Sequence, residues 1–194
     1  MATPNIVPRS DSEGGLGTAA KYWASAYIDA VNAATYNGIP FYSDVTNNSM
    51  YTHNVSATDD TAAFNTAYGF AAMDAITTGD QNTAVGYNTL TALSTGYGNT
   101  TIGAYTGDAL TTGVHNVAIG YASLTNETEH GKNVGVGYET LNQQNAGADA
   151  YNVAVGYQAG RAVTTGVQNA LIGGLAGDAL TIGNQNTALG YGAL

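Results

Sequence analysis

Residues 82–98 read NTAVGYNTLTALSTGYG, and residues 152–168 read NVAVGYQAGRAVTTGVQ. Both segments begin with Asn, carry Gly four residues later and contain a second Gly near their end. The same pattern runs from residue 65 to residue 194, and a fixed period of this kind indicates a repeat architecture. The repeat Asn residues, 17 apart except for one spacing of 19, are Asn65, Asn82, Asn99, Asn116, Asn133, Asn152, Asn169 and Asn186.

Glycine is the second fixed residue of the repeat. The glycines four positions after each Asn are Gly69, Gly86, Gly103, Gly120, Gly137, Gly156, Gly173 and Gly190. The second glycines of the full units are Gly79, Gly96, Gly113, Gly131, Gly147, Gly166 and Gly183. Gly has no Cβ and tolerates positive φ, so these positions predict corners or close approaches of backbone. Two glycines per unit among Val, Ile, Thr and Asn also disfavour helix.

The period predicts a β-solenoid over residues 65–194, with the eighth unit partial. Seventeen extended residues span about 56 Å, which is enough for one closed coil with two or three short strands and tight corners. Stacked coils would place each repeat Asn over the next, and side-chain amides stacked in this way form hydrogen-bonded ladders. The predicted fold class is therefore all-β.

The strand segment of each unit has two apolar faces. One face carries Thr83, Val85 and Tyr87, and the other carries only Ala84 and Gly86. A strand that is apolar on both faces is normally covered on both. One cover is the interior of the coil. We expect the second to be a sister chain packed against the small Ala/Gly face, and three chains around an axis are the simplest closed arrangement.

Aromatic residues recur at one place in the repeat, two positions after the strand. They are Phe70, Tyr87, Tyr121, Tyr138, Tyr157 and Tyr191. A stacked aromatic ladder that supports the coils is the favoured interpretation, and a sugar-binding platform is the alternative.

Residues 1–64 do not carry the repeat and predict an N-terminal anchoring or capping segment. Trp23 is the only Trp, and Leu16, Gly17 and Tyr27 lie near it in the sequence. A solenoid needs a cap, because its terminal coil otherwise exposes a strand edge and an open core. We expect these four residues to contribute to a cap, to a docking surface for a partner, or to both.

Composition excludes several classes of partner. Only 9% of residues are charged, the formal net charge is -10, and Lys plus Arg number four. Nucleic-acid binding requires clustered basic residues, and an anionic membrane surface is an equally poor partner. The N-terminal residues show no secretory signal, and no apolar run approaches the length of a membrane span. We therefore expect a soluble product that neither binds nucleic acid nor inserts into a membrane.

Catalytic and metal-binding patterns are missing from the sequence. The histidines, His53, His115 and His130, do not occupy one repeat position, and no His-x-x-x-His or phosphate-loop motif occurs. Asp74, Asp108 and Asp178 do share a position, which leaves a calcium ladder open, although ordinary exposed carboxylates fit better. There is no cysteine. We expect no enzymatic activity, no cofactor and no metal.

One region of the repeat is irregular. Residues 126–132 concentrate charge, and a two-residue insertion follows within residues 142–149. Together they predict a bump on the rod. A surface for a receptor or another protein would use Glu127, Glu129, His130, Lys132 and Asp149. Tolerated loop variation is the favoured alternative, because insertions in solenoids map to loops.

The NTAVGY and NVAVGYQAG units resemble the repeats of tail-fibre and other appendage proteins of tailed bacteriophages. They are also similar to the head repeats of bacterial trimeric autotransporter adhesins. Residues 16–23, LGTAAKYW, resemble the Leu-Gly…Trp motif that often precedes a fibre shaft. The resemblance implies a trimeric, left-handed β-roll or β-helix with a role in virion structure or host attachment. Adhesin heads normally carry a signal peptide and a membrane anchor, so the phage relationship is favoured.

These observations predict a homotrimeric structural component of a phage virion, made in the host cytoplasm without a signal peptide. Residues 1–64 would dock to other virion proteins, and residues 65–194 would form a stiff shaft that serves attachment to a host-surface glycan or receptor. The alternative is a carbohydrate-binding bacterial surface adhesin head. An ice-binding solenoid needs a regular Thr array, but the position after the repeat Asn alternates among Thr, Val and Ala.

Overall fold

The computed structural model describes residues 35–36, 39–40, 42–44, 49–52 and 61–194. All described residues belong to one compact unit of the chain, Ala34–Leu194. The predicted anchor residues Leu16, Gly17, Trp23 and Tyr27 lie outside the described residues. Within the described ranges the structure contains strands, turns and bends but no helix.

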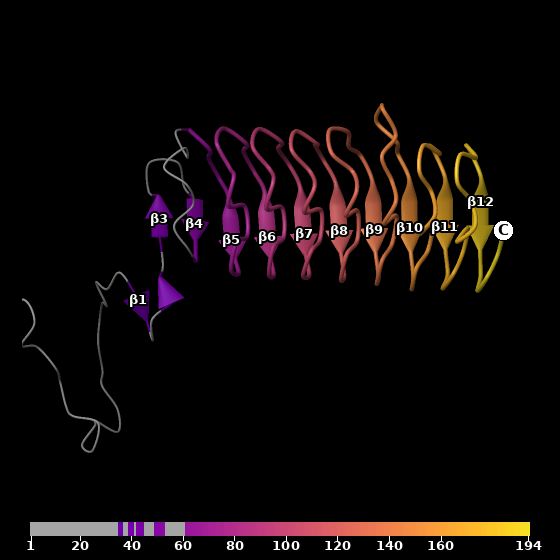
Figure 1. Ribbon diagram of the computed structural model, residues 1–194, viewed down its shortest axis with the longest axis horizontal. Helices are drawn as coiled ribbons and strands as arrows, with labels where there is room; N and C mark the ends of the chain where they lie inside the picture. Colours follow the sequence, from indigo (N-terminus) through magenta and orange to yellow (C-terminus); the bar gives the residue numbers. More distant parts are fainter. Residues whose placement is uncertain (1–34, 37–38, 41, 45–48, 53–60) are drawn as a thin grey trace, which may run out of the picture. The chain divides into compact units, whose positions relative to one another are not determined.

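The strands are short, and from β3 to β12 they follow one another in chain order along a single sheet (Figure 1). They are β1 (Thr35–Tyr36), β2 (Ile39–Pro40), β3 (Tyr42–Asp44), β4 (Ser49–Tyr51), β5 (Thr66–Tyr68), β6 (Thr83–Val85), β7 (Thr100–Ile102), β8 (Val117–Ile119), β9 (Val134–Val136), β10 (Val153–Val155), β11 (Ala170–Ile172) and β12 (Thr187–Leu189). β1 and β2 pair antiparallel with each other. β3 pairs antiparallel with β4, and β4 to β12 form one parallel sheet in chain order.

The parallel sheet has the register of a β-solenoid. Thr83 of β6 pairs with Thr100 of β7, and Val117 of β8 pairs with Val134 of β9. Each pair is separated by 17 residues, so one coil of chain returns to the same place one rung further along. The predicted all-β solenoid of 17-residue coils is thereby confirmed. The sheet also extends before the first repeat, since β4 pairs with β5.

Each coil contains one three-residue strand, whereas two or three strands were expected. The rest of the coil still bonds from rung to rung, as when the N–H of Leu90 donates to the carbonyl of Thr106 at 3.1 Å. Numbered from the repeat Asn as position 1, the non-glycine residues at positions 7, 9 and 17 have positive φ, for example Tyr105 (+55°), Leu90 (+50°) and His115 (+55°). These left-handed residues turn the chain too often for a second strand to form.

The glycine at position 5 is required by both backbone conformation and space. Gly103 has φ +137°, which side chains rarely adopt, and a Cβ built on it would lie 2.6 Å from the carbonyl oxygen of Gly120 in the next coil. Only Gly combines this φ with such close stacking. The prediction that the repeat glycines mark close backbone approaches is confirmed for this position in every unit but the last, where a Cβ built on Gly190 would meet nothing within 4 Å.

The repeat Asn residues form a buried ladder. The backbone N–H of Asn99 donates to the side-chain oxygen of Asn82 at 3.0 Å, and its own amide nitrogen donates to the carbonyl of Gly113 at 2.8 Å. Each Asn from Asn82 onward therefore connects its coil to the previous coil, and every repeat Asn except Asn133 and Asn186 also donates to the carbonyl at position 15 of its own coil. These bonds repeat along the solenoid, which confirms the predicted Asn stack.

The small-residue face of the strand lies inside the coil. Position 3, occupied by Ala84 in β6, is fully buried within a single chain, and Leu90 and Leu93 from positions 9 and 12 are buried beside it in the same core. The expectation that a sister chain covers the Ala/Gly face is therefore wrong. The coil is narrow, and large side chains entering from the opposite wall leave room only for small ones on the strand.

Size compensation inside the coil supports this explanation. Leu171 is the one large residue at position 3, and the position 9 residues beside it are Gly160 and Gly177. A Cβ at Gly160 would lie 2.7 Å from the Leu171 side chain, and one at Gly177 would lie 2.8 Å from it. The interior therefore accepts a large side chain from one wall only where the other wall has none.

Candidate functional site

The face of the strand that points away from the core forms an apolar stripe along the solenoid. It consists of positions 2, 4 and 6, and it carries Thr, Val, Ile, Leu or aromatic side chains in most coils. The most exposed large members are Tyr68, Phe70, Tyr87, Ile102, Tyr121, Tyr138, Val153, Val155, Tyr157, Ile172, Leu189 and Tyr191. An exposed apolar strip that continues through eight coils exceeds the scattered apolar residues of ordinary surfaces. We call positions 2, 4 and 6 the outward stripe.

Aromatic rings stack along the outward stripe. Tyr121 and Tyr138 lie 5.3 Å apart and Tyr138 and Tyr157 lie 5.4 Å apart, with nearly parallel rings. We number the coils from the one that begins at Asn65. Coil 3 has Ala104 at position 6, and the neighbouring Tyr105 fills the gap by edge contacts with Tyr87 and Tyr121. The predicted aromatic ladder is confirmed. Its rings nevertheless remain accessible, since Tyr138 is 42% and Tyr157 is 56% exposed.

The ring row affects the ionisation of two of its tyrosines. The negative charge that Tyr87 would carry raises the pKa of Tyr105, and burial adds to this. A hydrogen bond with Glu139 raises the pKa of Tyr138. Both phenols therefore remain neutral and able to donate hydrogen bonds throughout the physiological range.

The irregular region lies in coils 4 and 5. The loop between β9 and β10 extends farther from the sheet than the neighbouring loops do (Figure 1), as the predicted bump requires. Position 15, a glycine in regular coils, is occupied in coil 4 by His130, whose carbonyl accepts from the Asn116 amide at 3.2 Å. Gly131, grouped with the second glycines in the sequence, lies one position later. At the preceding corner, a Cβ on Gly113 would lie 2.6 Å from the carbonyl oxygen of His130, so a regular next coil leaves no room for a side chain at position 15.

The two-residue insertion of coil 5 provides that room. Gly147, which belongs to the inserted corner, has no heavy atom within 4 Å of a built Cβ, in contrast to the crowded glycines of regular corners. The displaced corner also leaves the Asn133 side-chain nitrogen without a partner among the described residues. His130 and the insertion are therefore two halves of one structural change.

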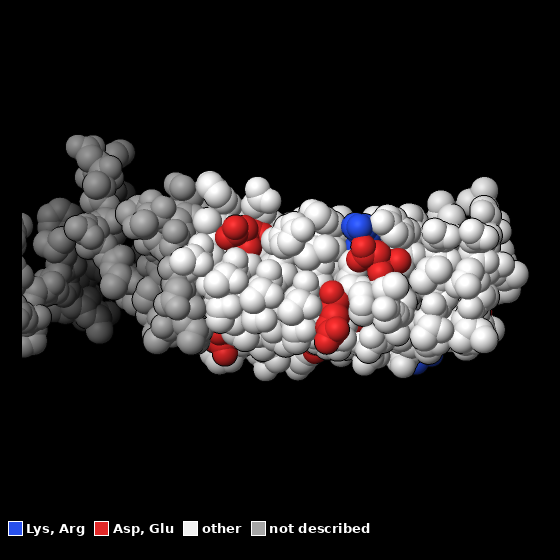
Figure 2. Space-filling model, turned by 90° about the horizontal axis from the view of Figure 1, so that it is seen from above, with Lys and Arg blue, Asp and Glu red and all other residues white. Residues whose placement is uncertain are grey.

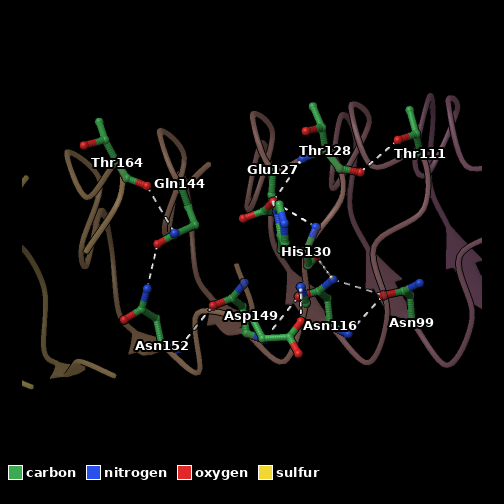
Figure 3. Close-up of polar contacts among 12 residues, drawn as sticks. Asn99, Thr111, Asn116, Glu127, Thr128, His130, Gln144, Asp149, Asn152 and Thr164 are labelled. Carbon is green, nitrogen blue, oxygen red and sulfur yellow. Dashed lines mark hydrogen bonds and ion pairs between the residues drawn. The ribbon is translucent and has the colours of Figure 1, made fainter. Parts of the chain in front are cut away.

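Glu127 lies at position 12, where the other coils place Leu, Ile, Val or Gln. It is fully buried, and its Oε1 accepts bonds from the backbone N–H groups of Thr128 and His130, each at 3.2 Å (Figure 3). The same oxygen lies 3.6 Å from Nδ1 of His130. The prediction that Glu127 belongs to a surface contact is therefore wrong. Position 12 points into the core whatever residue occupies it.

Gln144 occupies position 12 of the next coil and supplies a hydrogen-bond acceptor to the Asn ladder. Its Oε1 accepts from the Asn152 amide at 2.6 Å, and its Nε2 donates to the carbonyl of Thr164 at 3.1 Å (Figure 3). Sequence reasoning missed this role. The signal was the replacement of an apolar residue at position 12 in two successive coils.

Charged side chains at the bump pair with each other. Lys132 Nζ lies 2.7 Å from Asp149 Oδ2, donates to the Tyr151 hydroxyl at 3.0 Å and sits 5.1 Å from the centre of that ring. The hydrogen bond to Asp149 raises the pKa of Lys132, and the same bond lowers the pKa of Asp149. The predicted contacts Lys132 and Asp149 are therefore half-exposed and neutralised by each other, and Glu129 is exposed.

The rest of the surface has few charges. Figure 2 shows isolated acidic side chains on a mostly uncharged face, with one place where basic and acidic atoms adjoin. Within the described part of the chain, no three His, Asp or Glu residues lie together as metal ligands would. Asp74, Asp108 and Asp178 are in coils 1, 3 and 7, so they do not stack. Burial raises the pKa of Asp108.

No helix in the described ranges is long and apolar enough to span a membrane. Comparison of the chain with models of known families, with curated proteins and with solved structures found no match. The features that can carry function are therefore those of the chain itself, namely the outward stripe and the polar surface beside it.

Proposed function

We propose that this chain is a structural component of a phage virion, a trimeric fibre or appendage. Its N-terminal segment, residues 1–64, docks to other virion proteins, and its solenoid projects as a stiff shaft that serves host attachment. The single observation that carries the proposal is the outward stripe, an apolar surface repeated on every coil. The resemblance of the NTAVGY units to phage appendage repeats supplies the virion context.

A second copy of the chain is the best cover for the outward stripe. Adjacent rungs of a sheet lie about 4.8 Å apart, so two copies have side chains of the same spacing and can interlock along their whole length. Few other surfaces match that period. The stripe is also nearly free of charge, as the core of a stable subunit interface is. Closed cyclic symmetry then covers the stripe of every copy, and three copies are the smallest such ring after the dimer.

The shaft function is mechanical. Eight rungs at about 4.8 Å give a rod of roughly 35–40 Å. The Asn ladder and the backbone bonds of the position 5 glycines, such as Gly103 N–H to the Val85 carbonyl at 2.8 Å, are among the bonds that join each rung to the next. Bending would break these bonds along one side of the rod, so the repeat favours a straight spacer.

Sedimentation equilibrium of the full chain tests the assembly. We expect about 59 kDa, three times the 19.7 kDa of one chain, independent of concentration in the micromolar range. A stable monomer would overturn the trimer and leave the outward stripe unexplained.

The virion role needs a separate experiment. Gold-labelled antibody against residues 65–194 should decorate tailed particles purified from the source of the sequence, at a fixed site on each particle. Labelling of intact bacterial cells, with none on particles, would replace the virion role with that of a bacterial surface adhesin.

A further inference from the structure

A polar hollow of about 280 Å³ opens on the solenoid surface across coils 5 to 7. Its lining residues are Gln143, Gln158, Arg161, Ala162 and Asp178. They occupy positions 7, 10 and 11 of their coils, outside the three positions that form the outward stripe. The hollow therefore needs an explanation that is independent of the stripe.

The hollow arises from a local change in side-chain length. In coils 1 and 2, positions 7, 10 and 11 hold the short residues of a plain surface, among them Ala71, Ala75 and Ala92. In coils 5 and 6 four of these six positions hold long side chains, Glu139, Gln143, Gln158 and Arg161, and the other two hold Asn142 and Ala162. Ala162 at position 11 stays short and partly exposed, so it forms a floor between long neighbours.

Arg161, which lines the hollow, forms an ion pair with Glu139. Its Nε lies 3.0 Å from Oε2 of Glu139, and the Gln158 amide nitrogen donates to the same oxygen at 2.8 Å. The terminal guanidinium nitrogens make no hydrogen bond with any residue that the structure describes, and the side chain is 52% exposed. The terminal donors of Arg161 are therefore available to a ligand.

Acceptors lie around the same hollow. The Gln143 and Gln158 amides each use their nitrogen for an internal bond, to Asn142 at 2.7 Å and to Glu139 at 2.8 Å, which leaves both carbonyl oxygens available. The carboxylate of Asp178 has no hydrogen bond or ion pair within the described ranges. The residues that line the hollow thus offer both donors and acceptors.

We propose that this hollow binds a neutral saccharide. Each sugar hydroxyl both donates and accepts, so adjacent hydroxyls can donate to Asp178 and accept from Arg161 at the same time. Glu139 and Asp178 outnumber the one guanidinium, and the chain has a net charge of -10, so acidic sugars are repelled. The site gives the attachment role proposed above a ligand class and rests on that role for its biological meaning.

Binding of oligosaccharides to the full chain tests the site. The probes are glucose, galactose, mannose and N-acetylglucosamine oligomers on an array, with uronate-bearing oligomers of equal length as the acidic set. We expect at least one neutral series to bind and the acidic set to fail. Arg161→Gln and Asp178→Asn should each weaken that binding about tenfold or more, since each removes a hydrogen bond to a charged group.

Two further variants separate the hollow from general effects. Ala162→Leu fills the floor without changing charge and should abolish binding, while its circular dichroism and melting temperature stay those of the parent. Asp74→Asn makes the same charge change at position 10 in coil 1 and should bind as the parent does.

The site would be overturned by a parent chain that binds no neutral probe, or by Ala162→Leu binding as the parent does. If either result is found while the chain is a stable trimer and the virions are labelled, the sugar site is refuted and the fibre proposal stands. If the chain binds sugar but is not a trimer, or does not label virions, the fibre proposal is refuted and the sugar site stands.

Discussion

The side-chain oxygen of Asn82 accepts a hydrogen bond from the backbone N–H of Asn99, 17 residues later, at 3.0 Å. The amide of Asn99 also reaches the same oxygen, at 3.1 Å. One buried side chain thus fixes the register between two coils in a way that no residue of different length could. The same bond from a backbone N–H to the preceding Asn oxygen recurs in every subsequent coil, so the ladder keeps all the coils in one register.

Removal of one ladder residue should therefore be costly. Asn99→Ala leaves the carbonyl of Gly113 and the N–H of Asn116 buried without their partner. We expect a loss of about 2–4 kcal/mol in the free energy of unfolding, since each unsatisfied buried group costs about 1–3 kcal/mol. Urea denaturation followed by circular dichroism measures it. Thr112→Ala, at an exposed site in the same coil, is the control, and equal losses in both variants would contradict the ladder's importance.

The glycine column allows strain and crowding to be separated. Gly103→Ala places a Cβ 2.6 Å from the Gly120 carbonyl at φ +137°. We expect about 3 kcal/mol or more of destabilisation, from strain and overpacking together. Gly190→Ala has a similar φ, +121°, but meets nothing within 4 Å. It should cost only the strain, about 1–3 kcal/mol. Melting temperatures of both variants test this, and equal shifts would show that crowding contributes nothing.

A charge in the middle of the outward stripe should dissociate the proposed trimer without unfolding the chain. Val136→Asp points a carboxylate at the position where a sister copy would pack, and burying an unpaired charge there is unfavourable. The expected sedimentation mass falls from about 59 kDa towards 19.7 kDa. Thr112→Asp, outside the stripe, should remain trimeric. A trimeric Val136→Asp protein would place the interface elsewhere.

The insertion of coil 5 and His130 should be energetically coupled. Deletion of residues 148–149 restores a 17-residue coil with Gly147 at position 15, so its corner should collide with the His130 side chain. The deletion should be strongly destabilising alone and much less so with His130→Gly. We expect a coupling of about 1 kcal/mol or more, within the range for contacting residues. Loss of the Lys132–Asp149 pair is common to both backgrounds and cancels. Additive effects would refute the coupling.

The Lys132–Asp149 pair predicts a defined pH window. Because the bond to Lys132 lowers the pKa of Asp149, the ionised carboxylate stabilises the folded state at pH values above the ordinary pKa of 3.8. That stabilisation is lost as pH falls through the lowered pKa of the folded state. Because the same bond raises the pKa of Lys132, the ammonium stabilises the folded state at pH values below the ordinary pKa of 10.5. That stabilisation is lost as pH rises through the raised pKa of the folded state. The difference in melting temperature between the parent and Asp149→Asn should be constant from about pH 5 to 9 and vanish near pH 2. A difference that persists at pH 2 would exclude this ion pair as its cause.

Much of the candidate site could be predicted only in outline. The aromatic row and the bump were visible as repeat positions, because identical residues at one period must meet when coils stack. The burial of Glu127 could not be predicted from the sequence, because a charged residue is usually exposed to solvent. Position 12 is buried because of the path of the coil, whatever residue occupies it. The hollow around Arg161 was also missed, because its residues belong to three coils, and Gln143, Gln158 and Arg161 have no identical counterpart at their positions in any other coil.

The sequence by itself determined the period, the stacking of Asn on Asn and Gly on Gly, and hence the solenoid, because side chains repeated every 17 residues meet only if the coils are in register. Only the tertiary structure decided which strand face is inside. Both faces of NTAVGY are apolar, so hydrophobicity could not choose between them. The choice follows from volume: Leu90 and Leu93 fill the narrow coil, only Ala fits opposite them, and Val and Tyr are left outside.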